Sequence, residues 1–219
     1  MTARMGFKGQ LSAGEILNQV RCLPERDLLT NIVYMGMGEP FDNLDEVLKS
    51  LEILTAEWGF GMSPRRITVS TIGVVPGMER FLESSRCNLA VSLHSPFEEE
   101  RKALIPAAKA YPLQRVLDSI RSFTIEKQRR ISFEYIVFKD LNHSQRHVKA
   151  LARALDGIRC RINLLSFHPI PGSSLRAPER PDIESFRDAL QAKGFIATIR
   201  RSRGMDIQAA CGLLSVTQS

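Results

Sequence analysis

The sequence predicts an α/β protein in which parallel strands form a barrel or a doubly wound sheet. Short apolar, strand-like runs alternate with helix-like segments along the chain, and polar or glycine residues follow several of the runs. This alternation is typical of βαβ units. Six strands are few for a complete eight-stranded barrel. The chain opens with a loop and a helix, as if a preceding strand were missing, so we expect one α/β domain over residues 1–219, incomplete at its N-terminus.

The expected strands are short runs rich in apolar residues. They cover residues 31–37, 66–71, 88–93, 131–138, 161–167 and 195–200. Helices are expected between them, because apolar residues recur at helical spacing there. Ser12 and Glu15 form a capping box for the first helix, and Asn43 caps the second.

The later helices have start and stop signals of their own. Further helices are expected over residues 75–82, 97–104 and 144–155. Pro112 opens a helix that turns Val116 and Ile120 inward. Asp182 caps the last helix, which Gly194 ends.

The charge balance favours an anionic partner, and nucleic acid first. The net charge is +6 and the pI is about 9.4. Basic residues cluster at Arg65-Arg66, at Lys127 with Arg129-Arg130, and at Arg200-Arg201 with Arg203; the alternative is that these are solvated strand and loop ends. Aromatic residues make up 7% of the chain, which argues against an open base-stacking platform. No run is apolar enough to span a membrane or act as a signal peptide, so we expect a cytoplasmic protein that binds no membrane.

The four cysteines are scattered. Cys22, Cys87, Cys160 and Cys211 are far apart in sequence, which suits a reducing compartment better than a disulfide framework. An iron–sulfur cluster takes thiolates delivered a few residues apart, so this chain offers no cluster ligands. We expect the first three to be buried small hydrophobic residues.

Polar residues stand at four expected strand ends. The four segments are Gly36-Met37-Gly38-Glu39-Pro40, Ser70-Thr71, Ser92-Leu93-His94 and Phe167-His168-Pro169. Glycines let a backbone approach a ligand, and Glu39 offers an acceptor for an ammonium group. Each segment alone could be a tight turn or a structural cap. Because the carboxyl ends of parallel strands meet at one edge, four together predict a ligand pocket.

These residues resemble a known family. The resemblance rests on segments that run in order along nearly the whole chain, namely Met35–Pro40 with Asn43, Arg66–Thr71, Gly73–Pro76, Leu89–His94, Glu134-Tyr135, Ile162–Leu164, Pro171-Gly172, Arg203-Gly204 and Ala209–Gly212. The combination is similar to the radical S-adenosylmethionine RNA methyltransferases, which modify carbon-2 of adenine in large-subunit ribosomal RNA and in transfer RNA. A sister group that methylates carbon-8 shares much of the pattern.

The resemblance implies a partial (β/α) barrel of the radical-SAM type and a set of cofactor contacts. Gly38 and Glu39 match the contact to the methionine end of S-adenosylmethionine, and Ser70 matches a further contact. The stretch Ser92, Leu93 and His94 lies beneath the adenosine in the family. His168 stands where the family commonly has an asparagine, and it can still donate or accept a hydrogen bond.

Cys211 resembles the cysteine that accepts a methyl group and carries it to the base. A thiolate is a competent nucleophile toward a sulfonium methyl group, and the resulting thioether methyl can lose hydrogen to a 5′-deoxyadenosyl radical. Carbon-2 of adenine is too weakly nucleophilic for direct polar transfer, which is why a protein-bound carbon radical is needed.

The family also binds a [4Fe-4S] cluster through three cysteines on a loop after the first strand, and it takes electrons from a donor such as flavodoxin. The opening residues 2–7 resemble the segment directly after that loop, so we expect the first strand, the cluster loop and an N-terminal accessory domain to be missing. On that basis the chain alone should neither cleave S-adenosylmethionine nor methylate RNA. The alternatives are a cluster-free module that binds S-adenosylmethionine or RNA, and an inert fragment. A monomer is expected.

Overall fold

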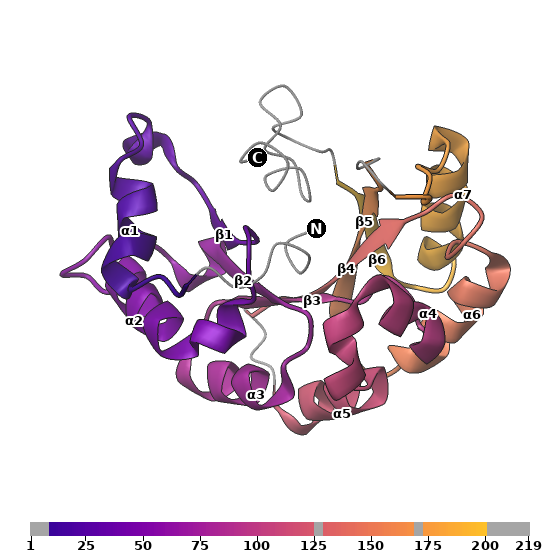
Figure 1. Ribbon diagram of the computed structural model, residues 1–219, viewed down its shortest axis with the longest axis horizontal. Coiled ribbons are helices and arrows are strands. Elements are labelled where there is room, and N and C mark those ends of the chain that lie inside the picture. Colours follow the sequence, from indigo (N-terminus) through magenta and orange to yellow (C-terminus); the bar gives the residue numbers. More distant parts are fainter. Residues whose placement is uncertain (1–8, 125–128, 169–172, 201–219) are drawn as a thin grey trace.

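The computed structural model describes residues 9–124, 129–168 and 173–200. These residues form one six-stranded parallel sheet, in which the strands stand side by side in chain order (Figure 1). The strands are β1 (Ile32–Tyr34), β2 (Ile67–Thr71), β3 (Asn88–Ser92), β4 (Ile131–Val137), β5 (Cys160–Ser166) and β6 (Ile196–Ile199). Within the described residues the sheet does not close, because β1 and β6 stand at its two edges. The predicted α/β class and partial barrel are confirmed.

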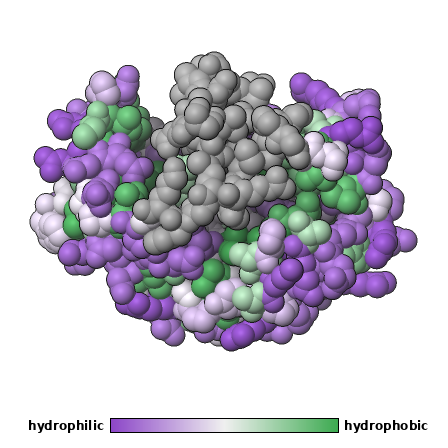
Figure 2. Space-filling view, in the orientation of Figure 1, coloured by the Kyte–Doolittle hydropathy of each residue, from purple (hydrophilic) through white to green (hydrophobic). Residues whose placement is uncertain are grey.

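Helices line the outer, convex side of the curved sheet (Figure 1). They are α1 (Ala13–Arg21), α2 (Leu44–Thr55), α3 (Val75–Ser84), α4 (Glu98–Leu104), α5 (Leu113–Ser122), α6 (Gln145–Ala154) and α7 (Arg180–Gln191), with short 3₁₀ turns η2 (Arg26–Leu28), η3 (Pro40–Asn43), η4 (Pro64–Arg66) and η5 (Pro106–Ala110). The outer rim of the molecule is mostly hydrophilic (Figure 2). No helix in the described ranges is long and apolar enough to cross a membrane.

The two faces of the sheet differ because successive side chains in a strand point to opposite sides. In β2, Ile67 and Val69 are buried in the core against the helices, whereas Ser70 is only half-buried. We call the face opposite the helices the inner face. The strand ends that receive the chain are the amino edge of the sheet, and the ends that release it are the carboxyl edge. Because every strand pair is parallel, each edge gathers loops of one kind.

Several expected element boundaries are corrected by the structure. β1 is shorter than the expected 31–37, because only Ile32–Tyr34 pair with β2 and the chain then turns away through Gly38 at a φ of +92°. The last helix begins at Arg180, before Asp182. Glu179 is its N-cap, and the Asp182 side chain accepts a hydrogen bond from the Glu179 amide.

The helix caps are partly as expected. The Ser12–Glu15 capping box is confirmed: the Ser12 amide donates to the Glu15 carboxylate at 2.8 Å, and the Glu15 amide donates to Ser12 Oγ at 3.3 Å. Asn43 stands at the N-cap position of α2, but its side chain makes no capping bond. Its Nδ2 instead donates to the Leu11 carbonyl at 2.7 Å, which ties α2 to the segment before α1.

Candidate functional site

The first loop at the carboxyl edge carries Gly38 and Glu39. Gly38 has a positive φ, a backbone conformation that favours glycine. A methyl group built on it would meet no atom within 4 Å, so the backbone conformation and not a lack of space calls for glycine there. Glu39 is the N-cap of η3, where its Oε1 accepts from the Phe41 amide at 3.1 Å. Its Oε2 accepts from the Ile72 amide at 2.8 Å. The carboxylate therefore ties the loop after β1 to the loop after β2.

Burial raises the pKa of the Glu39 carboxyl, although hydrogen bonds from Ile72, Phe41 and Thr71 oppose the rise. A carboxylate has about four lone-pair sites, so the two backbone bonds leave room for a further donor. Glu39 can thus still accept a hydrogen bond from an ammonium group of a ligand.

The second loop follows β2 and is held by its own side chains and by Arg101. Thr71 Oγ1 accepts from the amides of Gly73 at 3.0 Å and Val74 at 3.3 Å. Arg101, a fully buried residue of α4, donates from Nη2 to the Ile72 carbonyl at 2.6 Å and from Nη1 to the Tyr111 carbonyl at 3.1 Å. Ser70 stands on the inner face one residue before this turn. Its backbone is therefore fixed by contacts that leave its side chain on the open side of the sheet.

The third loop follows β3 and carries Ser92, Leu93 and His94. Ser92 is half-buried on the inner face, whereas the Leu93 side chain is fully buried in the core, so Leu93 can reach a ligand only through its backbone. His94 has a φ of +55°, which is uncommon outside glycine. Asn142, itself fully buried, donates from Nδ2 to the His94 carbonyl at 2.7 Å and holds that conformation.

His94 is neutral, and its tautomer is set by a backbone contact. Its Nδ1 accepts from the Ile136 amide at 3.1 Å, so the proton must be on Nε2. Burial, together with the nearby Arg101 charge, lowers the pKa of His94 to about 4. The imidazole is half-buried, and the Ile136 amide shields its Nδ1 from solvent. His94 can therefore offer a neutral N–H donor at physiological pH.

The fourth loop carries His168, which is half-buried and stands two residues beyond β5. The preceding amide, that of Phe167, donates to the Val137 carbonyl at 3.2 Å and joins the ends of β4 and β5. The four segments singled out in the sequence thus lie along one edge, in the order β1, β2, β3, β5. Cys211 lies outside the described residues.

A row of polar side chains, to which the sequence pointed with no individual roles, lies on the inner face. Glu134, which is only 8% exposed, accepts from Asn163 Nδ2 at 2.7 Å and from Ser132 Oγ at 3.1 Å. Asn163 Oδ1 in turn accepts from Thr198 Oγ1 at 3.1 Å. Burial raises the pKa of Glu134, while its hydrogen bonds and Arg200 lower it. The signal was present in the alternation of Ser132 and Glu134 within an apolar run.

The row lies next to the third loop. Glu134 pairs with Ser92 on one side and with Asn163 on the other, so polar groups run from the end of β3 across the inner face to β6. A carboxyl, an amide and hydroxyls side by side are the groups that hydrogen-bond a polar ligand.

The described residues do not fit an iron–sulfur cluster. Among them no three His, Cys, Asp or Glu side chains come close enough to hold a metal ion. Cys22 is exposed at the end of α1, which corrects the expectation that it is buried. Cys87 is buried before β3, as expected, whereas Cys160 at the start of β5 is only half-buried. Burial raises the pKa of Cys87 and raises that of Cys160 to about 12, so both remain thiols.

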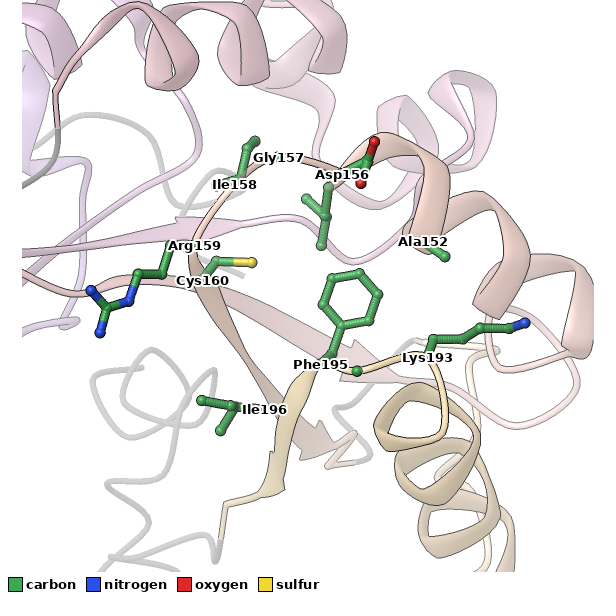
Figure 3. A pocket seen from close by; sticks show the side chains of 11 residues that line it. Ala152, Asp156, Gly157, Ile158, Arg159, Cys160, Lys193, Phe195 and Ile196 are labelled. Atoms are coloured by element: carbon green, nitrogen blue, oxygen red, sulfur yellow. The ribbon is translucent and has the colours of Figure 1, made fainter.

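A pocket of about 330 Å³ lies at the opposite, amino edge of the sheet (Figure 3). Cys160, Lys193, Phe195 and Ile196 are among its lining residues, and none of the predicted site residues lines it. Because none of the four polar loops contributes to this pocket, we place the candidate site at the carboxyl edge.

Known proteins are similar to this chain over most or all of its length. A family model described as the radical SAM superfamily matches residues 2–152. The chain is 57% identical over 219 residues to a protein of Parabacteroides distasonis named "Probable dual-specificity RNA methyltransferase RlmN", covering all of this chain and 64% of that protein. It is 44% identical over 220 residues to the "Dual-specificity RNA methyltransferase RlmN" of Nautilia profundicola, covering 98% of this chain and 62% of that protein.

A solved structure is similar as well. The crystal structure of a radical SAM methyltransferase from Sphaerobacter thermophilus superposes with a TM-score of 0.90 at 40% identity, covering 96% of this chain and 63% of that one. A domain of pyruvate-formate lyase-activating enzyme from Bacteroides vulgatus, at 18% identity and a TM-score of 0.57, shares the fold. The chain therefore spans slightly less than two thirds of the length of the relatives it matches.

Proposed function

We propose that this chain, which belongs to the radical SAM superfamily, is the core domain of an RNA methyltransferase acting on carbon-2 of adenine in ribosomal and transfer RNA. The observation that carries the proposal is the 57% identity over the whole chain to a protein named as a dual-specificity RNA methyltransferase. The convergence of four polar loops at the carboxyl edge supports it, because that edge holds the functional loops in parallel barrels.

In this proposal the first three loops bind S-adenosylmethionine, which supplies a sulfonium methyl group when bound. Gly38 and Glu39 receive the methionine end, where the Glu39 carboxylate accepts from the ammonium group. Ser70 adds a hydroxyl from the inner face, and Ser92 and Leu93 line the adenosine. His94 offers its Nε2 proton to an acceptor on the ligand, because a pKa of about 4 leaves the ring neutral and the Ile136 amide occupies Nδ1.

His168 contributes a fourth contact at the end of β5. Cys211, outside the described residues, is proposed as the methyl-accepting thiol. The described residues offer no site for a [4Fe-4S] cluster. We further propose that the whole protein is a cytoplasmic monomer, takes electrons from a donor such as flavodoxin and acts on RNA.

The lack of a cluster site in the described part of the chain favours one other function, a module that binds S-adenosylmethionine or RNA without turnover. Methylation of adenine carbon-8 is the third candidate, because the related group shares the sequence pattern. Binding and product identity separate these three functions.

The binding test is equilibrium dialysis of the chain against labelled S-adenosylmethionine. We expect saturable binding that weakens at least tenfold when Glu39 becomes Gln or Ser70 becomes Val, and that is unchanged when Ser122 becomes Ala on the outer helix α5. Absence of saturable binding in the unaltered chain contradicts the cofactor site.

The activity test uses a chimera in which this chain replaces the matching segment of the Parabacteroides distasonis relative. Nucleoside analysis of the RNA after reaction should show 2-methyladenosine, and Cys211→Ala should abolish it. The appearance of 8-methyladenosine selects the carbon-8 activity. A folded chimera that binds S-adenosylmethionine but methylates no RNA, beside an active relative, leaves the binding module.

A further inference from the structure

We propose that five arginines at the amino edge of the sheet form a surface that binds the phosphate backbone of the RNA substrate. The amino-edge arginines are Arg65, Arg66, Arg130, Arg159 and Arg161. The inference rests on the proposed function for the identity of the anion, and on the structure for the surface. The surface lies across the sheet from the candidate cofactor site.

The topology brings together residues that are far apart in sequence. Arg65 and Arg66 end η4, directly before β2; Arg130 directly precedes β4; Arg159 directly precedes β5, and Arg161 is its second residue. In a parallel sheet all of these positions fall at the same edge. Three sequence segments thus contribute to one surface.

Hydrogen bonds fix the neighbourhood of Arg65 and Arg130. Asn88 donates from Nδ2 to the Arg65 carbonyl at 2.8 Å, and its Oδ1 accepts from the Arg130 amide at 3.0 Å. The Arg130 guanidinium also reaches the Arg65 carbonyl, at 3.4 Å. Asn88 is 5% exposed, so the bridge beneath the arginines is rigid.

The register of the strands places the remaining arginines beside Arg130. Ser132 of β4 pairs with Arg161, and Ile131 pairs with Cys160, the residue after Arg159. Neighbouring strands are about 4.8 Å apart, so the surface from β2 to β5 is about 15 Å wide. At about 3.4 Å per nucleotide along one strand of a duplex, that width spans about four phosphates.

The five arginines of this surface are free to bind an anionic partner. All five arginines are exposed, and none of them forms an ion pair with a described acidic side chain. Arg159 is one of the residues that line the amino-edge pocket, and Figure 3 shows its guanidinium pointing away from Phe195. On the outer helices, in contrast, several arginines are bound to carboxylates, including Arg80 to Asp45 and Arg180 to Glu184.

Arg129 lies next to Arg130 in the sequence but is not part of the surface. It precedes Arg130 in sequence, but its guanidinium donates to the carbonyls of Phe81, Leu82 and Cys87 and lies 5.1 Å from the centroid of the Phe81 ring. Arg129 therefore serves the packing of α3. Of the cluster of Lys127 with Arg129-Arg130, Arg129 is thus structural and Arg130 faces solvent, while Lys127 lies outside the described residues.

An extended phosphodiester fits this surface better than a small anion. A guanidinium binds phosphate oxygens through paired N–H donors, and five of them over about 15 Å exceed what one phosphate can contact. The strands of five to seven residues separate the amino and carboxyl edges by about 16–23 Å. A partner that meets both edges must therefore be large, as a folded RNA is.

The test compares RNA affinity across salt concentrations for two variants of equal charge. The first replaces all five amino-edge arginines by Gln. The control replaces by Gln five exposed cations of the helix side that form no ion pair with a described carboxylate, namely Lys49, Lys109, Arg115, Lys149 and Arg153. Both lower the net charge of +6 by the same amount. Fluorescence anisotropy with labelled transfer RNA gives the slope of log affinity against log salt.

Each lost phosphate contact reduces the magnitude of the slope by about 0.7 to 0.9. We therefore expect the slope of the amino-edge variant to be smaller in magnitude by about 3 or more, and that of the control variant by less than about 1. Equal slopes for the two variants, or an amino-edge variant that binds like the unaltered chain, overturn the surface. If the unaltered chain binds no RNA, the surface and the RNA-directed function both fail. If it binds RNA and only the amino-edge variant is unaffected, the function stands without the surface.

Thermal unfolding and dialysis against S-adenosylmethionine check that both variants are folded. Should the fivefold variant fail to fold, two smaller ones, Arg65→Gln with Arg66→Gln and Arg159→Gln with Arg161→Gln, replace it. Each pair should lower the slope by about 1 or more. An unchanged slope in both pairs overturns the surface.

Discussion

Arg101 and Ile72 are joined by a 2.6 Å hydrogen bond from the buried guanidinium to a main-chain carbonyl, while the amide of the same Ile72 donates to Glu39 at 2.8 Å. One residue of the loop after β2 is thus held from two sides, by α4 and by the loop after β1. The position of Ser70, two residues earlier, depends on both contacts.

Replacing Arg101 by Met should lower the free energy of unfolding by about 2–4 kcal/mol, because the carbonyls of Ile72 and Tyr111 lose their buried donor. Urea unfolding measures the loss. Arg115→Met, on the exposed side of α5, is the matched control and should change stability by less than about 0.5 kcal/mol. A similar small effect for both variants would show that the buried guanidinium does not hold the loop.

His94 should remain neutral well below pH 6. Its pKa in the folded chain is about 4, against an ordinary value of 6.5, so the unfolded chain binds more protons between these pH values. Stability from this group is therefore complete above about pH 6.5 and is lost as the pH falls toward 4. Histidine NMR titration measures the pKa directly, and Arg101→Met should raise it by removing a nearby positive charge. A His94 signal that titrates near 6.5 contradicts the buried, bonded imidazole.

Asn142 should be among the least replaceable polar residues of the carboxyl edge. Its side chain accepts from the Phe138 amide at 2.9 Å and donates to the carbonyls of His94 and Ile136, each at 2.7 Å. Asn142→Ala leaves these three buried groups without partners and should cost about 3 kcal/mol. Gln145→Ala, on the exposed start of α6, is the control in the same unfolding measurement; equal costs would mean that the three bonds add nothing.

Gly73 and Gly157 both have positive φ angles, of +103° and +75°, but they differ in the space around them. A methyl group at Gly73 would lie 2.8 Å from Val116 Cγ2, whereas Gly157 has open space. Gly157→Ala should cost about 1 kcal/mol from the backbone alone, and Gly73→Ala about 1–3 kcal/mol more from the clash. Calorimetric melting of both variants measures the two losses in the free energy of unfolding. A smaller loss for Gly73→Ala than for Gly157→Ala contradicts the prediction.

The sequence predicted the fold well because the decisive signals are local. Alternation in β2 and β4 and the Ser12–Glu15 capping box depend on residues a few positions apart. It missed contacts that join distant segments. Arg101 looked like one charge on a short helix, yet it is 29 residues from the Ile72 carbonyl that it binds. Asn142, 48 residues from His94, has no local pattern that marks it as a link between two loops.

The candidate site was predictable to the same degree. The four strand ends could be placed at one edge once the strands were taken as parallel, and the structure confirms that placement. The hydrogen bonds that occupy Glu39 and His94 come from the loop after β2 and from β4 itself, and sequence spacing does not reveal these contacts. The roles of these residues toward S-adenosylmethionine stay predictions.

The most direct test of the cofactor site is a ¹⁵N-histidine NMR titration with S-adenosylmethionine. The chain has four histidines. His94 and His168 belong to the proposed site, whereas His143, in the loop after β4, contacts the Phe138 carbonyl and the Phe186 ring, and His147 of α6 contacts Glu100. We expect saturable shifts of the His94 and His168 signals with those of His143 and His147 unchanged. Saturable binding that leaves His94 unshifted, or no binding at all, contradicts a cofactor site at the carboxyl edge.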